Sequence, residues 1–336
     1  MNKEELKEFN EISKRQEKNL FVFSLVASYL NDAPYFITKD LINEVSKGNK
    51  SLEEYSYALL LSNAFTDDDK LADELFDEYF KISVKRLNEK EYYENPYYKN
   101  IKIPCKQIGK WTLGNQEYQP YEGFIRDDII IDGYKEIPSI GYFDKKFVYP
   151  TVFENGVEWM AIKPNEIETM KELIEKARGS VLVYGLGLGY YAYMISLKNS
   201  VSDVTIIERD ENAISLFNEH ILPQFENKHK IKVVKSDAFD YAKNEAKKHK
   251  YDFAFVDLWH DISDGTDLYI EMKKLEKHLP NTEFSYWIEK SILSAIRVRL
   301  FDTIFKQVQK GDSKQALNEI KSMLSDEFIR GLIANS

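Results

Sequence analysis

The stretch Val181-Leu-Val-Tyr-Gly-Leu-Gly-Leu-Gly189 decides the fold. Four β-favouring residues lead directly into glycines at alternate positions, and a helical pattern starts at Tyr190. A strand, a glycine-rich turn and a helix in this order bring the backbone and the amino end of a helix close to a ligand. We therefore expect Gly185, Gly187 and Gly189 to form a ligand-binding loop, although glycines also occur in ordinary strand-to-helix turns.

Strand and helix patterns alternate from this stretch to residue 289. Helices of this length between strands are typical of right-handed βαβ units, which build a parallel sheet with helices on both faces. In such sheets, ligands bind at the carboxyl ends of the strands. The predicted strands are 181–184, 204–208, 231–235, 253–258 and 284–289, and the predicted helices are 190–197, 212–220, 241–248 and 268–278.

Three acidic residues lie at the ends of three of these strands, at the edge where the loop would hold a nucleoside. Glu208 follows Gly187 by 21 residues and is placed to accept hydrogen bonds from two ribose hydroxyls. Asp237 is placed to accept a hydrogen bond from an adenine amino group, with Ala238 leaving room for the ring. Asp257 would face the reacting centre. Each acid taken alone is better explained as a solvated or capping residue, but their occurrence at successive strand ends favours a shared site.

These segments resemble the class I S-adenosylmethionine-dependent methyltransferase fold, and within it the spermidine-synthase-like branch. The resemblance covers about a third of the chain and is carried by Val181–Gly189, Ile206–Asp210, Ser236–Ala238 and Tyr251–Asp257. It implies a Rossmann-like α/β sheet of order 3-2-1-4-5, with the three glycines along the methionine part of the cofactor. It also implies that Glu208 binds the ribose and Asp237 the adenine. Because the pattern after Lys290 is helical, the usual last hairpin of such a sheet has no candidate.

The segment after the fourth strand, Asp257-Leu-Trp-His-Asp261, is the candidate for catalysis. The spermidine-synthase-like branch typically has Asp-Ser-x-Asp-Pro here, so His260 stands at the second acidic position and Asp261 one residue later. A histidine beside carboxylates titrates near neutral pH and can act as a general base, and Trp259 can stack on a planar or cationic acceptor. The alternative is that His260 caps the next helix and Trp259 packs under the loop.

Tyr190, the remaining histidines and the single cysteine limit the possible cofactors and metals. Tyr190 is a candidate cofactor contact, although an aromatic residue at the start of such a helix usually packs in the core. It also stands where the dinucleotide-binding pattern requires glycine, which argues against a nicotinamide dehydrogenase. The remaining histidines lack metal-ligand spacing, and the single cysteine, Cys105, forms no internal disulfide or cysteine-based metal cluster, so we expect no metal site.

Three further segments surround the α/β domain, which we place at 164–289. Residues 1–95 have helical periodicity, and Asn95-Pro96 ends that region because a residue before proline disfavours the helical conformation. Residues 96–163 contain short β-favouring runs separated by glycines, which predicts a small antiparallel β subdomain. Residues 290–336 are expected to be helical. The sequence leaves open whether the N-terminal helices form a lid, a homo-oligomer surface or a partner-binding module.

Composition limits the class of protein. The 336 residues include 46 basic and 56 acidic side chains, a net charge of −10, and 43% are hydrophobic. Such a chain buries a core, and an acidic chain without a basic stripe is unsuited to nucleic acid. No apolar run is long enough to span a bilayer and the acidic first residues do not resemble a signal peptide, so we expect a cytoplasmic protein without a membrane partner.

The leading hypothesis is an enzyme that transfers a methyl group from S-adenosylmethionine to a small, neutral or cationic acceptor. The first alternative is aminopropyl transfer from decarboxylated S-adenosylmethionine to a polyamine, which the branch resemblance and the acidic charge favour. The second is a non-catalytic nucleoside-binding module whose N-terminal helices recognise a partner protein.

Overall fold

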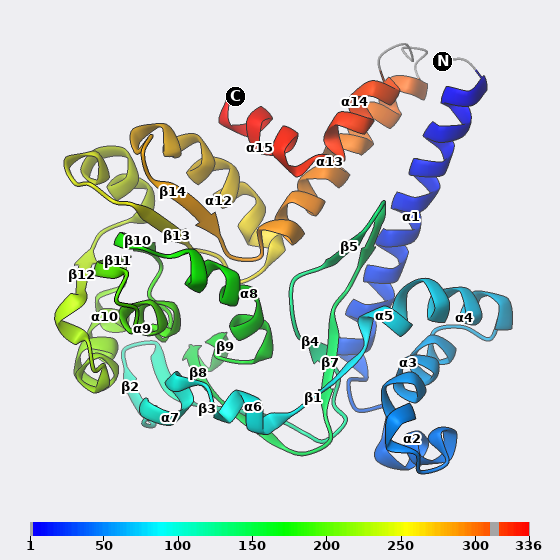
Figure 1. Cartoon of the computed structure of the whole chain (residues 1–336), viewed down its shortest axis with the longest axis horizontal. Coiled ribbons are helices and arrows are strands. Elements are labelled where there is room, and N and C mark those ends of the chain that lie inside the picture. The colour runs from blue at the N-terminus through cyan, green and yellow to red at the C-terminus, as the bar shows by residue number, and fades with distance from the viewer. Residues whose placement is uncertain (1–2, 310–315, 336) are drawn as a thin grey trace. The chain divides into compact units, whose positions relative to one another are not determined.

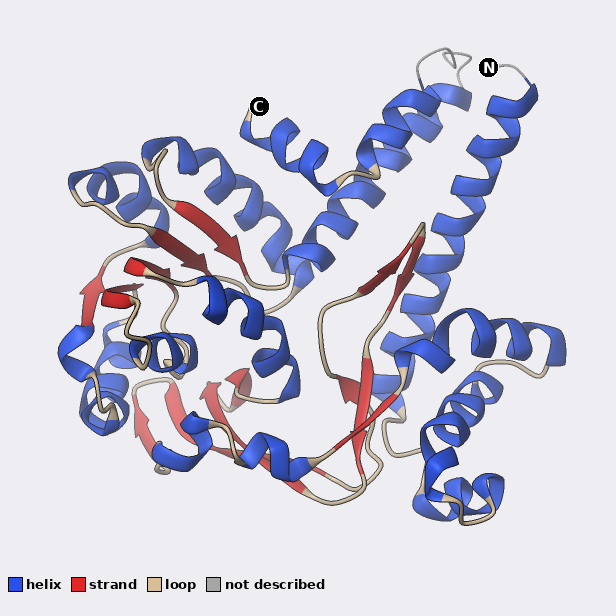
Figure 2. Cartoon of the chain, in the orientation of Figure 1, coloured by secondary structure: helices blue, strands red, loops and turns tan. Residues whose placement is uncertain are grey.

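The computed structural model describes residues 3–309 and 316–335, which form two compact units (Figure 1). As far as they are described, the first comprises Met1–Glu91, Glu117–Val148 and Leu300–Leu324, and the second Tyr92–Gln116, Tyr149–Arg299 and Ser325–Ser336. Both units contain helices and strands (Figure 2). The expected β segment 96–163 is therefore divided between the two units.

A five-stranded parallel sheet forms the centre of the second unit. Its strands are β10 (Gly179–Tyr184), β11 (Val201–Glu208), β12 (Ile231–Lys235), β13 (Phe253–Val256) and β14 (Glu283–Tyr286), in the order β12-β11-β10-β13-β14. Each neighbouring pair is parallel. Residues 181–184 and 253–256 are buried because both faces of their strands carry apolar side chains. The predicted parallel α/β sheet is confirmed, and its observed order, counted from β10, reads 3-2-1-4-5.

Helices connect the strands of this sheet. α8 (Pro164–Lys176) precedes β10, and the glycine loop leads from β10 into α9 (Tyr190–Ser196). The later connections contain α10 (Glu211–Leu216), α11 (Ala238–Asp240) and α12 (Ile262–Leu275), extended by η3 (Phe217–Ile221), η4 (Leu222–Gln224), η5 (Lys228–Lys230), η6 (Tyr241–Glu245), η7 (Ala246–Lys248) and η8 (Glu276–His278). After β14 the described chain contains only α13 (Glu289–Gln309), α14 (Ala316–Met323) and α15 (Asp326–Ala334).

A four-stranded sheet, ordered β2-β3-β8-β9, supplies further residues to the second unit. It consists of β2 (Lys106–Ile108), β3 (Trp111–Tyr118), β8 (Phe147–Glu154) and β9 (Val157–Ala161). β2 with β3 and β8 with β9 form antiparallel hairpins. Through these hairpins Trp111 on β3 and Trp159 on β9 line the same cavity as the residues at the ends of the parallel strands.

The first unit is mainly helical. Its helices include α1 (Lys3–Asp32), α2 (Lys39–Ser46), η1 (Lys50–Leu52), α3 (Glu53–Ala64), α4 (Asp69–Leu75), η2 (Phe76–Phe80), α5 (Lys81–Ser83), the part of α13 from Leu300 on, and α14. The division between the units falls within α6 (Glu89–Tyr93), and α7 (Pro96–Asn100) belongs to the second unit. Strands β1 (Lys85–Leu87), β7 (Ile140–Phe143) and β4 (Phe124–Ile125) form one sheet, and β5 (Ile130–Asp132) pairs with β6 (Lys135–Ile137). Tyr57 stacks on Tyr142 with 4.2 Å between ring centroids, so large aromatic side chains fill this core.

The boundaries of the expected segments differ from those of the two units. In the described part of residues 1–95, the regular elements are helices, except for β1, which pairs in parallel with β7. That pairing joins residues 85–87 to residues 141–143, so the middle of the expected β subdomain belongs to the helical unit. Within residues 3–309 and 316–335, no helix combines the length and apolar character that crossing a membrane requires.

Candidate functional site

The glycine loop lies against the end of strand β13. Gly185 has φ +101°, and a β carbon on this residue would overlap the backbone carbonyl oxygen of Asp257. Glycine adopts positive φ readily and leaves that space empty. The N–H of Gly185 donates to the carbonyl of Ile207 at 3.0 Å, which ties the loop to β11 as well. The loop is therefore held at the carboxyl ends of the two strands that flank β10.

The other two glycines of the loop take different places. Gly187 lines a cavity, and a β carbon there would lie 3.2 Å from the sulfur of Met160. Gly189 precedes α9, a β carbon there would overlap the ring of Phe217, and Gly189 is not among the residues that line the cavity. Gly189 therefore shapes the turn, whereas Gly185 and Gly187 present their backbone to the cavity.

Tyr190 packs in the core of the second unit. Only 2% of its surface is exposed, its hydroxyl accepts a hydrogen bond from Nδ2 of Asn95 at 2.9 Å, and its ring meets that of Tyr97 edge to face. It does not line the cavity. Tyr190 is therefore a core residue, the second of its two expected roles, because the first turn of α9 directs this side chain toward α7.

Glu208 ends β11 and lines the cavity. Its Oε1 accepts hydrogen bonds from the backbone N–H groups of Arg209 and Asp210 at 2.8 and 2.9 Å. Burial raises the pKa of Glu208, and these backbone hydrogen bonds oppose the rise. A carboxylate fixed in this way accepts further hydrogen bonds from hydroxyl groups.

Asp237 follows β12 and caps the short helix α11. Its Oδ1 accepts hydrogen bonds from the backbone N–H groups of Phe239 and Asp240 at 2.9 and 3.1 Å. Asp237 and Ala238 also line the cavity, so Asp237 both caps α11 and faces the cavity. This is consistent with a ligand role because the cap uses only one of the two carboxylate oxygens.

Asp257 and Glu166 are two enclosed carboxyl groups of the same cavity. Burial raises the pKa of Asp257 to about 7, and this residue is partly exposed and lines the cavity. Glu166, in the first turn of α8, is 5% exposed. Burial, and then the charge of Asp257, raise the pKa of Glu166 well above its usual range, and Lys163 opposes that rise. Carboxyl groups that share a poorly solvated site resist ionising together.

Trp259 lines the cavity and also supports the loop. Its side chain is 5% exposed, and its ring lies nearly parallel to that of Tyr286 with 6.4 Å between centroids. A β carbon on Gly265 would lie 2.8 Å from the indole, so α12 packs tightly against it. Both interpretations of Trp259 in the sequence analysis are therefore compatible with its position.

His260 and Asp261 occupy the solvent side of this segment. The side chain of His260 is 46% exposed and lines the cavity, and its Nδ1 lies 3.6 Å from Oδ2 of Asp261. Asp261 caps α12 by accepting a hydrogen bond from the backbone N–H of Ser263 at 2.6 Å, and it does not line the cavity. The structure thus brings His260 to the site and gives Asp261 a capping position beside it.

The cavity measures about 240 Å³ and lies at the carboxyl ends of the parallel strands. Its lining includes seven carboxyl side chains: Glu154, Glu166, Glu208, Asp210, Asp237, Asp257 and Asp264. Only Lys110 and Arg209 among its lining residues are permanently basic. A cleft with this charge attracts cations. In the described part of the chain, no cluster of three or more histidine, cysteine or acidic residues is arranged to hold a metal ion.

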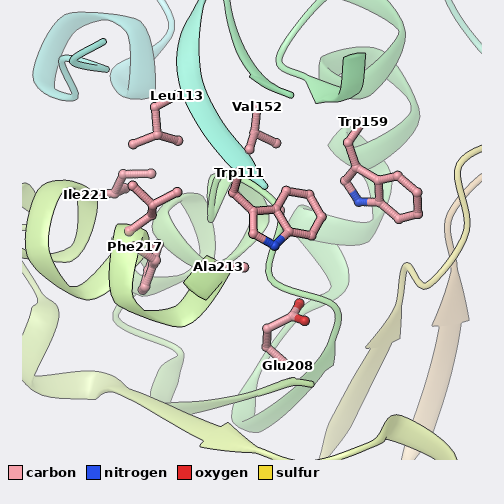
Figure 3. A pocket seen from close by; sticks show the side chains of 10 residues that line it. Trp111, Leu113, Val152, Trp159, Glu208, Ala213, Phe217 and Ile221 are labelled. Atoms are coloured by element: carbon pink, nitrogen blue, oxygen red, sulfur yellow. The ribbon is translucent and has the colours of Figure 1, made fainter. Parts of the chain in front are cut away.

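A smaller cavity of about 30 Å³ shares Trp111, Trp159, Gly187 and Glu208 with the first. In Figure 3, the apolar side chains of Leu113 and Val152 lie above Trp111, and the carboxylate of Glu208 lies below it. Trp111 and Trp159 meet edge to face with 6.0 Å between ring centroids. The site therefore combines an apolar, aromatic end with an acidic end.

Sequence reasoning missed Glu166, Trp111 and Trp159. Glu166 stands in the first turn of a helix, where an acidic residue is expected from the helix dipole alone. The two tryptophans lie on strands, where large aromatic residues usually pack in a core. No local pattern separates these roles, because the cavity joins elements that are distant in the sequence.

Residues 164–274 match the family model of the spermine/spermidine synthase domain. No curated protein matches the chain. Among solved structures, the chain is similar to spermidine synthase from Thermotoga maritima, with 16% identity over 41% of this chain and 49% of that one and a TM-score of 0.31. A spermidine synthase in complex with the transition state analogue AdoDATO gives 15% identity, 42% and 53% coverage and a TM-score of 0.31. The matched regions span about half of the length of these solved chains.

The family match corrects the leading hypothesis of the sequence analysis. The matched segment contains the glycine loop, Glu208, Asp237 and the segment from Asp257 to Asp261, and the model that it matches describes a spermine/spermidine synthase domain rather than a methyltransferase. The prediction of methyl transfer is therefore wrong. The spermidine-synthase-like part of the predicted resemblance is the part that the match supports.

Proposed function

We propose that the protein transfers the aminopropyl group of decarboxylated S-adenosylmethionine to a primary amine of the polyamine class. The observation that carries the proposal is the charge of the cavity, where seven carboxyl side chains face two permanently basic ones. Both reactants are cations, so the field of this cavity attracts both. The family match over 164–274 supports the same reaction.

The enclosed acids support a donor that has lost its carboxylate. S-adenosylmethionine carries a carboxylate at the end of its side chain, and a further negative charge beside Glu166 and Asp257 would be repelled in this poorly solvated site. The decarboxylated form ends in an ammonium group, which compensates those charges. We therefore expect the decarboxylated donor to bind in preference to S-adenosylmethionine.

In this proposal, the loop and the strand ends hold the nucleoside part of the donor. Gly185 and Gly187 let the backbone approach it, Glu208 accepts hydrogen bonds from the ribose, and Asp237 accepts one from the adenine amino group beside Ala238. Trp111 and Trp159 add aromatic surface at the apolar end of the site. Gly189 acts only through the turn that begins α9.

The chemical step is a displacement at carbon. The lone pair of the acceptor nitrogen forms a bond to the aminopropyl carbon attached to sulfur, the carbon–sulfur bond breaks, and its electron pair remains on sulfur in 5′-methylthioadenosine. The acceptor must lose a proton to supply that lone pair. Asp257 is the proposed acceptor of this proton because its pKa of about 7 lies near neutral pH.

The residues after Asp257 assist in different ways. His260 lines the cavity with a partly exposed side chain, which suits it to pass the proton to water. Asp261 acts through His260 and the cap of α12, and is a positioning residue. Trp259 forms an apolar wall for the methylene groups of the substrates.

A turnover assay tests the proposal. The purified chain is incubated with decarboxylated S-adenosylmethionine and putrescine, and mass spectrometry measures the aminopropylated amine and 5′-methylthioadenosine in equal amounts. Asp257→Asn is expected to lower the rate by about 10²–10⁴-fold. Asp267→Asn, which changes a side chain that is 83% exposed, is the matched control and should leave the rate unchanged. A wild-type protein that binds 5′-methylthioadenosine but forms no product refutes the proposal and favours a non-catalytic nucleoside-binding module.

A further inference from the structure

Glu166 is a buried carboxyl group whose hydrogen bonding is incomplete. It is 5% exposed, it lines the cavity, and its Oε2 has no hydrogen-bond partner among the described residues. Burying a carboxyl oxygen without a partner costs free energy, so such groups are rare unless a ligand, an ion or water completes them. Because Glu166 also lines the cavity, a ligand bound there is the candidate for the missing partner.

Glu166 lies beside two other carboxyl groups and one ammonium group. They are Asp257, Glu158 and Lys163. Nζ of Lys163 already donates a hydrogen bond to Oε1 of Glu158 at 2.6 Å. Three carboxyl groups thus share one ammonium group. Burial and the charge of Asp257 favour the protonated form of Glu166, so a cation bound beside these two groups would favour ionisation of Glu166.

The position of Glu166 is fixed by the packing of α8. Ile167 and Met170, on the same helix, are 3% and 1% exposed, so the first turn of α8 is anchored in the core. Asp257 reaches the same cavity from the end of β13. His260, the third residue after Asp257, lines it with a side chain that is 46% exposed. The enclosed end of the site therefore contains Glu166 and Asp257, and the histidine faces solvent.

We propose that Glu166 and Asp257 together bind the reacting ammonium group of the acceptor, and that Glu166 supplies the second carboxylate that residue 260 does not. This inference rests on the proposed function and explains how the site selects the amine acceptor of that reaction. An ammonium group has three N–H donors, so two carboxylates can accept from it at once. When Asp257 takes one proton, Glu166 keeps its hydrogen bond to the nitrogen and orients the lone pair toward the donor carbon. A hydroxyl group of the same shape lacks the charge that this site requires.

Binding measurements on full-length variants test the inference. The protein is saturated with 5′-methylthioadenosine and titrated with putrescine by calorimetry. Glu166→Gln keeps the shape and removes the charge, and it is expected to raise the Kd for putrescine about tenfold or more. The Kd for 5′-methylthioadenosine should stay within about twofold of wild type, which reports an intact fold. Glu166→Asp keeps the charge and should retain more of the putrescine affinity than Glu166→Gln.

Glu172→Gln is the matched control. It removes one carboxylate from the same helix, at a side chain that is 67% exposed and does not line the cavity, so both affinities should be unchanged. A neutral probe, 1,4-butanediol, should not compete with putrescine for the wild-type protein. If Glu166→Gln binds putrescine as wild type does, or if the wild type with bound 5′-methylthioadenosine does not bind putrescine, the inference is overturned.

These outcomes separate the inference from the proposed function. A wild-type protein that binds putrescine through Glu166 but forms no aminopropylated product supports the binding site and refutes the reaction. A wild-type protein that forms the product, with an unchanged KM for the amine in Glu166→Gln, supports the reaction and refutes the role of Glu166.

Discussion

The backbone carbonyl oxygen of Asp257 occupies the space that a side chain on residue 185 would need. The glycine loop after β10 and the segment after β13 are therefore in direct contact through their backbones. Because the same segment provides the carboxyl group of Asp257, a change in the loop moves a candidate catalytic residue. Binding and chemistry are expected to be coupled through this one contact.

Gly185→Ala tests the contact between residue 185 and the carbonyl of Asp257. The added methyl group overlaps the carbonyl of Asp257 and the residue has φ +101°, so we expect the free energy of unfolding to fall by about 3 kcal/mol or more, measured by urea denaturation. Gly156→Ala is the control because Gly156 also has positive φ, +82°, but open space around it, and it should cost only about 1 kcal/mol. Equal losses in the two variants would show that the contact with Asp257 is unimportant.

The pH dependence of turnover should report Asp257. A protonated carboxyl group cannot accept the proton of the amine, and burial raises the pKa of Asp257 to about 7. The kcat of the wild type is therefore expected to fall as the pH decreases through about 7, rather than near the usual range of an aspartate. An acid limb that begins only near pH 4 would exclude Asp257 with a raised pKa as the group involved.

The stability of Glu166→Gln should depend on pH. Because the folded protein raises the pKa of Glu166, the folded state binds more protons than the unfolded state above the ordinary pKa of a glutamate. The contribution of Glu166 to the free energy of unfolding of the wild type is therefore most favourable at low pH and decreases as the pH rises. Glu166→Gln removes that loss, so its midpoint of thermal unfolding should exceed that of wild type by more at pH 8 than at pH 5. A difference that does not change with pH would contradict the burial of a titrating carboxyl group.

Glu208→Gln should weaken nucleoside binding. The carboxylate is fixed by two backbone N–H groups, and the amide replaces a charged acceptor with a neutral one that has a single oxygen. We expect the Kd for 5′-methylthioadenosine to rise about tenfold, measured by calorimetry. Glu211→Gln, three residues later at a side chain that is 72% exposed, is the control and should bind normally. An unchanged Kd in Glu208→Gln would remove this residue from the site.

The sequence by itself determined the parallel α/β region and much of the cavity wall. The glycine loop, Glu208, Asp237 and Asp257 could be found because parallel strands end at the same edge, so residues that follow different strands meet there. Local periodicity likewise predicted the helices of residues 1–95. These features depend on residues close together in the sequence or on a general property of parallel sheets.

Only the tertiary structure decided how enclosed that edge is. Glu166 and Asp257 are ninety-one positions apart, and they line one cavity only because the first turn of α8 and the end of β13 meet there in the fold. The turn of α9 that places Tyr190 in the core, and the hairpins that bring Trp111 and Trp159 to the cavity, are also set by long-range packing. A sequence pattern records which side chains are acidic or aromatic, but the dielectric environment that shifts a pKa and the partner that a carboxylate lacks arise only when distant elements close around it.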